Sequence, residues 1–467
     1  MSDLGEKCGV FGVYGKGLGA GRLAFFGLYA LQHRGQESSG IATSDGERIY
    51  CHKKMGLVPQ VFTEKDIQKL PGYIAIGHNR YSTSKSSNIK HAQPVFIEDV
   101  GLTLAHNGNL PSTHALEVFL ASKNAVYKTL SDSEMIAEAV AVWMRQGLSL
   151  PDAIAKIYPL ITGAFSILMM DKASLVAIRD PFGIRPLSMA TLNGGFVFSS
   201  ETCALHPIGA SFTRDVNPGE MVVANEAGIT ARQLAPGNQK LDIFEFVYFA
   251  RPDSLLLGKS VYGVRKNCGI ELAKEFPIEA DVVIPVPETS IPAAIGFSRA
   301  AGIPLETGLI KNRYIHRTFI APEQHIRDQG VKLKLTPLPE VIRGKRVVIV
   351  DDSIVRGTTS RQLVQMVFDA GATEVNFVVC SPPVLFPDFY GIDTPKQENL
   401  LAAQMSVEEM RTYLGATRLH FLSYAGLIRA TELPEEVFCT SCFTGEYPLD
   451  IKERAKEIRP LAAVRLF

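Results

Sequence analysis

The chain has 467 residues, too many for one compact core, so two or three domains are expected. Hydrophobic residues make up 46% of the chain and charged residues 21%, the balance of an ordinary globular enzyme. The formal net charge is zero, which argues against nucleic acid or a membrane surface as a main partner.

The first seven residues lack the basic region and apolar core of a secretory signal. The sequence has no apolar run long enough to span a bilayer. Seven cysteines do not make a disulfide scaffold in a chain of this size, and their odd number indicates reduced thiols. These features predict a cytoplasmic protein.

The first predicted strand, Cys8–Val13, is apolar and begins with a cysteine. Composition alone favours a buried core thiol. If residues 1–7 are removed as a propeptide, however, Cys8 becomes the N-terminal residue and carries its own base. An α-amino group has a pKa near ~8, so part of it is neutral at pH 7 and can accept the thiol proton.

Polar, glycine-bounded stretches then alternate with short apolar segments. They are Leu31–Gly40, Gly77–Thr83, Leu104–Asn109 and Leu130–Glu134, the last opening a predicted helix that runs on to Trp143. Each has an ordinary interpretation on its own, because an Asn-Gly pair most often forms a turn and Asp132 most often caps a helix. Short apolar runs from Gly163 to Glu220 predict further strands.

Together these stretches resemble the glutamine amidohydrolase domain of the N-terminal-nucleophile class, an α+β fold built as an αββα sandwich. The resemblance implies that Cys8 attacks the glutamine side-chain amide and that Asn107 and Gly108 hold the oxyanion. It implies three further residues at the glutamine site: Arg80 for the α-carboxylate, Asp132 for the α-ammonium, and Arg34 to order the adjacent loop.

The sequence departs from this family at a few positions near the expected site. Asn79 stands where the family usually has an apolar residue, and Ser84-Lys85 replaces a small residue and a glycine. Lys7 precedes Cys8 where an acidic residue is expected.

A polar stretch over residues 224–240 contains Pro236-Gly237 and predicts a domain boundary. We expect a propeptide at 1–7, an amidotransferase domain at 8–235 and a second domain at 236–467. In the second domain, predicted strands at 281–284, 346–350 and 374–379 alternate with helices, which favours an α/β fold with a parallel sheet.

The second of these strands is an unbroken β-branched run that ends at Asp351 and Asp352. Ligands of open α/β sheets bind at the carboxyl ends of the strands. Gly357 and the three hydroxyl residues after it precede a helical pattern at 361–370, and such a turn can hold a phosphate. Ordinary helix caps explain the same residues equally well.

The stretch Val350–Ser360 closely resembles the loop that binds phosphoribosyl diphosphate (PRPP) in type I phosphoribosyltransferases. The resemblance implies PRPP-binding residues Asp351, Asp352, Ser353, Arg356, Gly357, Thr358, Thr359 and Ser360. It also implies a Mg²⁺ ion near Thr289, Asp351 and Asp352, held mainly by the substrate. A basic segment from Lys311 to Lys334 looks like the loop that closes over PRPP, with His316 where a small residue is usual.

Many members of the amidophosphoribosyltransferase family, which the sequence resembles, carry a [4Fe-4S] cluster on four cysteines. Cys439 and Cys442 match two of those positions, but Asp242 and Asp388 occupy the other two. Since such a cluster normally needs four thiolates, we expect none here.

Over nearly its whole length the chain resembles the amidophosphoribosyltransferases. This implies glutamine-dependent transfer of ammonia to PRPP, through an interior apolar path, as the first committed step of purine synthesis. It also implies inhibition by purine nucleotides and a homotetramer or homodimer. The alternative is a PRPP-sensing regulator without catalysis, but such a regulator should carry a basic nucleic-acid-binding domain, and this chain is neutral.

Overall fold

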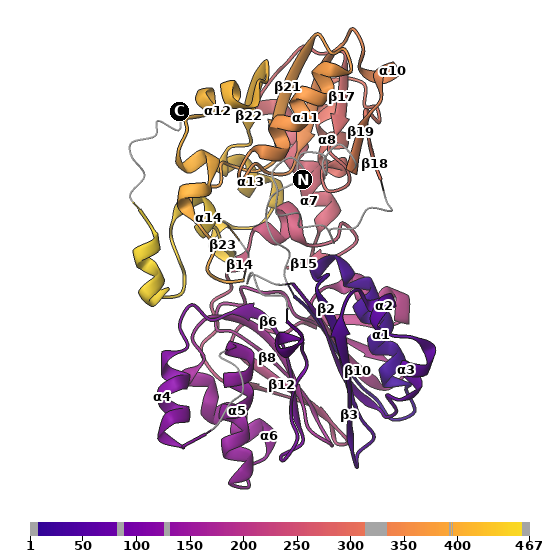
Figure 1. Cartoon of the computed structure of the whole chain (residues 1–467), viewed down its shortest axis with the longest axis vertical. Coiled ribbons are helices and arrows are strands. Elements are labelled where there is room, and N and C mark those ends of the chain that lie inside the picture. The colour runs from indigo at the N-terminus through magenta and orange to yellow at the C-terminus, as the bar shows by residue number, and fades with distance from the viewer. Residues whose placement is uncertain are drawn as a thin grey trace.

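A computed structural model describes residues 8–81, 88–125, 131–312, 334–391, 394 and 396–459 (Figure 1). The N-terminal half of the chain forms the lower body in this view, and the C-terminal half forms the upper one. The predicted loop containing His316 and the Ser84-Lys85 departure lie outside the described residues.

Two antiparallel sheets form the N-terminal body. The first has the order β11-β9-β10-β1-β4-β2-β3 and the second the order β13-β12-β8-β7-β6-β5. The strands of the first are β1 (Gly9–Tyr14), β2 (Ser38–Ser44), β3 (Ile49–Met55), β4 (Ile74–Arg80), β9 (Ser188–Leu192), β10 (Gly195–Ser199) and β11 (Ser211–Asp215). Those of the second are β5 (Val95–Ile97), β6 (Leu102–Asn109), β7 (Ala164–Met170), β8 (Leu175–Arg179), β12 (Glu220–Asn225) and β13 (Gly228–Gln233).

Helices cover the outer face of each sheet. On the first sheet these are α1 (Ala20–Ala30), α2 (Val58–Val61) and α3 (Glu64–Gln68); on the second they are α4 (His114–Ser122), α5 (Asp132–Arg145) and α6 (Leu150–Ile157). Alternation along β1 explains the layers, because Val10 packs between the sheets while Phe11 packs beneath the α1 layer. The predicted αββα sandwich is therefore confirmed.

The C-terminal body is built on a parallel sheet of order β17-β20-β21-β22, as predicted. Its strands are β17 (Val282–Pro285), β20 (Arg346–Asp351), β21 (Glu374–Val379) and β22 (Arg418–Phe421). One face packs on α7 (Val261–Glu275), α8 (Ile291–Ala301) and α13 (Tyr424–Thr431), and the other on α11 (Thr358–Asp369) and α12 (Val407–Leu414). The β-branched run of β20 is buried because Val348 faces the first group and Val347 the second.

Helix α11 begins three residues before the predicted helical pattern. Gly357 precedes it with φ +74°, and Thr358, Thr359 and Ser360 form its first turn. The prediction that these hydroxyl residues form a turn before the helix is therefore wrong in detail. Their hydroxyls and the unsatisfied N–H groups of a helix start remain on the same turn.

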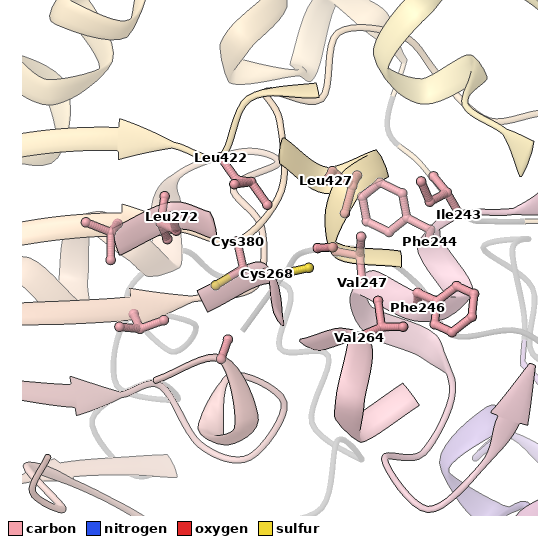
Figure 2. Close-up of a cluster of buried hydrophobic side chains, with 14 of the residues drawn as sticks. Ile243, Phe244, Phe246, Val247, Val264, Cys268, Leu272, Cys380, Leu422 and Leu427 are labelled. Carbon is pink, nitrogen blue, oxygen red and sulfur yellow. The ribbon is translucent and has the colours of Figure 1, made fainter. Parts of the chain in front are cut away.

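The segment after β13 joins the two bodies. Strand β14 (Leu241–Asp242) pairs in parallel with β23 (Phe438–Cys439), and a π-helix, η6 (Glu245–Phe249), follows β14. Phe246 and Val247 of η6 are buried in the core of the second body (Figure 2). Among the helices that the structure describes, none is both long and apolar enough to cross a membrane.

Candidate active sites

Cys8 lies immediately before β1, at the end of the sandwich where β4 also ends. Strand pairing places Gly9 opposite Asn79, and Arg80 follows on β4. Burial raises the pKa of the Cys8 thiol, a hydrogen bond from the Tyr81 backbone and the charge of Arg80 lower it, Asp132 raises it and Arg34 lowers it. The structure therefore brings the predicted nucleophile together with all three predicted glutamine-binding residues.

Strand β6 carries the predicted oxyanion donors. Asn107 is 1% exposed, and neither polar atom of its side-chain amide has a hydrogen-bond partner among the described residues. An unsatisfied buried amide costs about 1–3 kcal/mol, so its presence suits a ligand that would accept the hydrogen bond. At Gly108 (φ +155°) an added Cβ would lie 1.9 Å from the Ala164 carbonyl oxygen, so only glycine fits.

Two histidines connect β6 to its neighbours: His78 links β4 to β6, and His106 links β6 to α5. His78 Nε2 donates to the His106 carbonyl oxygen at 3.0 Å, and burial lowers the pKa of His78 to about 3. His106 Nδ1 lies 3.7 Å from Asp132 Oδ2. Asp132 starts α5, where its Oδ1 accepts a hydrogen bond from the Ser133 backbone at 2.7 Å. The second oxygen of this partly exposed carboxylate thus lies near His106, whose Nδ1 is hydrogen-bonded to Ser133 Oγ at 3.2 Å.

Arg80 is not isolated, because its Nη1 donates to Glu37 Oε2 at 2.9 Å. Sequence reasoning missed Glu37, although it lies within the Leu31–Gly40 stretch.

The unusual Asn79 is accommodated: its amide donates to the Leu28 carbonyl at 2.7 Å and accepts from Ser39 Oγ at 3.0 Å. A polar residue at this family departure is therefore fully satisfied in the core.

Arg34 is buried rather than facing the substrate. Its Nε donates to the Cys8 carbonyl oxygen at 3.2 Å, and its two terminal nitrogens bind Glu201 and Glu245. Burial lowers the pKa of Arg34, but Glu245 and Glu201 raise it by a larger amount. The net shift is upward, so the guanidinium is charged. Sequence reasoning missed both glutamates, because pairing across more than 160 residues leaves no local signal.

The second candidate site lies at the carboxyl end of the parallel sheet. Asp351 ends β20, and Asp352 follows with a pKa raised to about 7 by burial and by the charge of Asp351. Ser353 Oγ donates to Asp352 Oδ1 at 2.9 Å, and Ser290 Oγ lies 3.4 Å from Asp351 Oδ1. Parallel pairing of β17 with β20 puts the partly exposed Thr289 at this same edge.

The turn after Asp352 leads into α11. Arg356 is exposed, Gly357 adopts the left-handed conformation, and Thr358 begins the helix with Thr359 and Ser360 after it. At Gly357 an added Cβ would meet Leu401 at 2.5 Å. The structure thus places the eight predicted PRPP-binding residues on one strand end, one turn and one helix start. Two carboxylates and hydroxyl oxygens at this edge suit a hard cation such as Mg²⁺.

The four positions that hold a cluster in some relatives also converge. Asp242 lies opposite Cys439 in the β14–β23 pair, and the charge of Asp388 raises the pKa of both Cys439 and Cys442. Both carboxylates are engaged by Arg185, whose guanidinium lies 3.0 Å from Asp242 and 3.6 Å from Asp388. Burial raises the pKa of Cys439 to about 12. At these four positions only two thiols are present, and the two carboxylates are bound to an arginine, so these residues do not fit a [4Fe-4S] cluster, which normally needs four thiolates.

An αββα sandwich with a cysteine before its first strand, joined to a parallel sheet with a carboxylate pair, defines a glutamine amidotransferase coupled to a phosphoribosyltransferase. Two family models agree: a glutamine amidotransferase domain matches residues 78–207, and a phosphoribosyl transferase domain matches residues 259–381. The chain is 50% identical to the amidophosphoribosyltransferase of Synechococcus elongatus over 458 residues, covering 97% of this chain and 93% of that one.

A solved structure is also similar, the glutamine PRPP amidotransferase of Bacillus subtilis in complex with ADP and GMP. It superposes with a TM-score of 0.89 at 44% identity and covers 96% of this chain and 98% of that one. The chain belongs to the amidophosphoribosyltransferase family, the glutamine-dependent PRPP amidotransferases of purine biosynthesis.

Proposed function

We propose that Cys8, exposed as the N-terminal residue by loss of residues 1–7, starts the reaction of this family. The chain transfers ammonia from glutamine to PRPP and forms 5-phosphoribosylamine, pyrophosphate and glutamate. The observation that best supports Cys8 is its position between Arg80, which follows Asn79 on the paired strand β4, and Arg34, whose Nε donates to the Cys8 carbonyl oxygen at 3.2 Å.

The glutamine half-reaction follows from these groups. Because burial keeps the Cys8 thiol protonated, the neutral α-amino group of the same residue takes its proton. The sulfur attacks the side-chain amide carbon, and Asn107 with the Gly108 N–H stabilises the oxyanion that forms. Ammonia leaves with the transferred proton, and water then hydrolyses the thioester to glutamate. Arg80 binds the substrate α-carboxylate and Asp132 its α-ammonium.

An apolar cluster supports transfer of ammonia between the sites. The cluster begins at Ile243 and Phe244, next to the junction of the two bodies, and extends to Cys268 and Cys380 (Figure 2). The Cys380 N–H donates to the Asp351 carbonyl oxygen at 2.9 Å, so the cluster reaches the carboxylate edge of the parallel sheet. Neutral ammonia can cross such an interior without the desolvation cost of ammonium.

The second half-reaction uses the parallel sheet. We propose that the start of α11 and the hydroxyls of Ser353, Thr358, Thr359 and Ser360 bind the 5′-phosphate, while Asp351 and Asp352 accept from ribose hydroxyls. Thr289 and the two aspartates would hold Mg²⁺, which when bound would supply positive charge for the leaving pyrophosphate. The exposed Arg356 completes the proposed PRPP-binding set, and Gly357 shapes the loop by its left-handed turn.

We further propose the boundary at 235/236, between β13, which ends at Gln233, and β14, which begins at Leu241.

The Bacillus subtilis relative was solved with ADP and GMP, which supports inhibition of this chain by purine nucleotides. A homotetramer or homodimer remains the expected assembly. The cited relatives are named as the enzyme, which favours catalysis over the PRPP-sensing regulator.

Product stoichiometry tests the function. With glutamine, PRPP and Mg²⁺ present, glutamate and pyrophosphate should appear in equal amounts, and the intact mass should be that of a chain beginning at Cys8. Glutamate release without pyrophosphate would indicate another acceptor. PRPP binding without either product would support the regulator.

Changing Gly108 to alanine should damage the glutamine half-reaction selectively. The added Cβ would lie 1.9 Å from the Ala164 carbonyl oxygen, so β6 must shift and move the oxyanion donors. Loss of such a donor costs on the order of 10²–10³ in kcat. Glutamine-dependent turnover should fall by that factor while ammonia-dependent turnover persists. Gly147→Ala is the matched control, since Gly147 has φ +89° with open space around it and should leave both rates unchanged.

A further inference from the structure

The two bodies share a buried set of charged side chains beneath Cys8. We call it the junction network: Arg34, Arg185 and Glu201 come from the first body, and Asp242, Glu245 and Asp388 from the second. All six are buried. Ordinary stability does not require such an arrangement, because buried ion pairs are often no more stabilising than apolar packing.

Glu245 makes the most direct link in the junction network between the second body and the nucleophile. Its two oxygens accept from both terminal nitrogens of Arg34, at 2.9 and 3.0 Å, and this bidentate pair fixes the plane of the guanidinium. The remaining nitrogen of Arg34, Nε, donates to the carbonyl oxygen of Cys8. One carboxylate of the second body is therefore a single side chain away from the backbone of the nucleophile.

The position of Glu245 is set by the second body. Glu245 is the first residue of η6, and the next two residues, Phe246 and Val247, are buried in the second core beside Val264 and Cys268 (Figure 2). Arg265 also holds η6, because its guanidinium donates to the carbonyl oxygens of Phe246 and Ala250, both at 2.8 Å. The backbone that carries Glu245 is therefore anchored in the second body.

Glu201 holds Arg34 from the first body but is fully engaged. It also accepts from His33 at 2.8 Å, from the Arg251 backbone at 2.9 Å and from Ser254 Oγ at 2.8 Å. Burial raises the pKa of Glu201, but His33 and Arg34 lower it by a larger amount, so Glu201 stays ionised. Without Glu245, Arg34 would keep one carboxylate contact, to Glu201, and its hydrogen bond to the Cys8 carbonyl, but would lose the bidentate pair that fixes the plane of its guanidinium.

We propose that Glu245 is a positioning residue for the glutamine half-reaction: it holds Arg34 against the carbonyl of Cys8. The glutamine site is then completed by a residue of the second body. This inference rests on the proposed role of Cys8 as nucleophile. Small displacements of a reacting group can reduce rates by about 10²-fold. Loss of the Glu245–Arg34 ion pair should therefore have a measurable effect on the rate through the position of Cys8.

The test is Glu245→Gln in the full-length enzyme. The amide is isosteric but cannot form the charged bidentate pair. We expect kcat for glutamine hydrolysis to fall by about 10-fold or more, with a smaller change in KM for glutamine, and the rate of Cys8 alkylation by iodoacetamide to change in parallel. Ammonia-dependent synthesis of phosphoribosylamine should stay within about twofold of the parent, because η6 is otherwise intact.

Asp242→Asn is the matched control, since it removes a buried carboxylate of the junction network that binds Arg185 at 3.0 Å, while Arg34 keeps both Glu201 and Glu245. Its glutamine kinetics should stay close to those of the parent enzyme. If kcat for glutamine hydrolysis fell equally in both variants and Tm fell with it, the junction network would only stabilise the fold. That result would overturn the proposal. Unchanged kinetics in Glu245→Gln would overturn it as well.

A double variant separates positioning from general damage. If Glu245 acts through Arg34, then adding Glu245→Gln to Arg34→Gln should cost almost nothing more in kcat, whereas independent roles would give multiplied losses and refute the proposal. Should Glu245→Gln not fold, Glu245→Asp keeps the charge and withdraws it by one methylene, and the same comparison applies. Failure of Cys8 itself as nucleophile would be recognised separately, by glutamine hydrolysis that survives Cys8→Ala.

Discussion

Replacement of Cys8 with alanine is expected to reduce glutamine-dependent turnover by about 10⁴-fold or more, the scale seen when a covalent nucleophile is removed. In the proposed mechanism Cys8 is the nucleophile, whereas Arg80 and Asp132 bind the substrate α-carboxylate and α-ammonium, so neither takes over its role. Free ammonia should still support phosphoribosylamine formation at nearly the parent rate, because the PRPP site lies on another sheet. The measurement is glutamate and pyrophosphate release with glutamine or ammonium chloride as the nitrogen source.

Cys51→Ala provides the control, because Cys51 is an exposed thiol on β3 of the same body. It should leave both activities unchanged. Glutamine hydrolysis at the parent rate by the Cys8→Ala enzyme would refute the thioester route. Loss of the ammonia-dependent activity as well would show that Cys8 supports the fold or the second site.

Most of the fold was predictable because hydrophobic patterning is local. The β-branched run before Asp351 predicted a strand buried on both faces, and β20 is such a strand. Helix boundaries were less accurate: the apolar spacing from residue 361 gave no sign that the helix already begins at Thr358. That start depends on the left-handed conformation of Gly357, which apolar spacing does not encode.

The candidate site was predicted as a set of motifs, but not as a set of partners. Cys8, Arg80 and Asp132 lie in stretches that resemble the family when taken together, and the structure places Arg80 and Asp132 close enough to Cys8 to act on the pKa of its thiol. No role was predicted for Glu37, Glu201 or Glu245, because a glutamate is usually a solvated charge and only tertiary packing turns it into a buried ion-pair partner.

Two departures from the family show how context decides the outcome of a substitution. Asn79 is tolerated in the core because Leu28 and Ser39 satisfy its amide. At the cluster positions, Asp242 and Asp388 are tolerated because Arg185 lies between them. Burial raises the pKa of Asp242 to about 6 although Arg185 lowers it. Neither compensation could be inferred from the neighbouring sequence.

Asp352→Asn is expected to reduce kcat/KM for PRPP by about 10²-fold or more with either nitrogen source, because one carboxylate of a cation and ribose site is lost. Basal glutamine hydrolysis without PRPP should persist, since Cys8 lies on the other body. Asp369→Asn, at the exposed end of α11, should leave PRPP kinetics unchanged. Equal losses in both variants, or none in Asp352→Asn, would contradict the proposed role.

The same carboxylate gives the PRPP site a pH dependence of known sign. Burial and the charge of Asp351 raise the pKa of Asp352 to about 7, so in the free enzyme the group is ionised above that pH and protonated below it. The proposed role of Asp352 in binding Mg²⁺ and PRPP needs the ionised form, so log kcat/KM for PRPP should fall as pH drops below about 7 while kcat at saturating PRPP changes less. Asp352→Asn should abolish this limb of the profile. A profile unchanged by the substitution would assign the titration to another group.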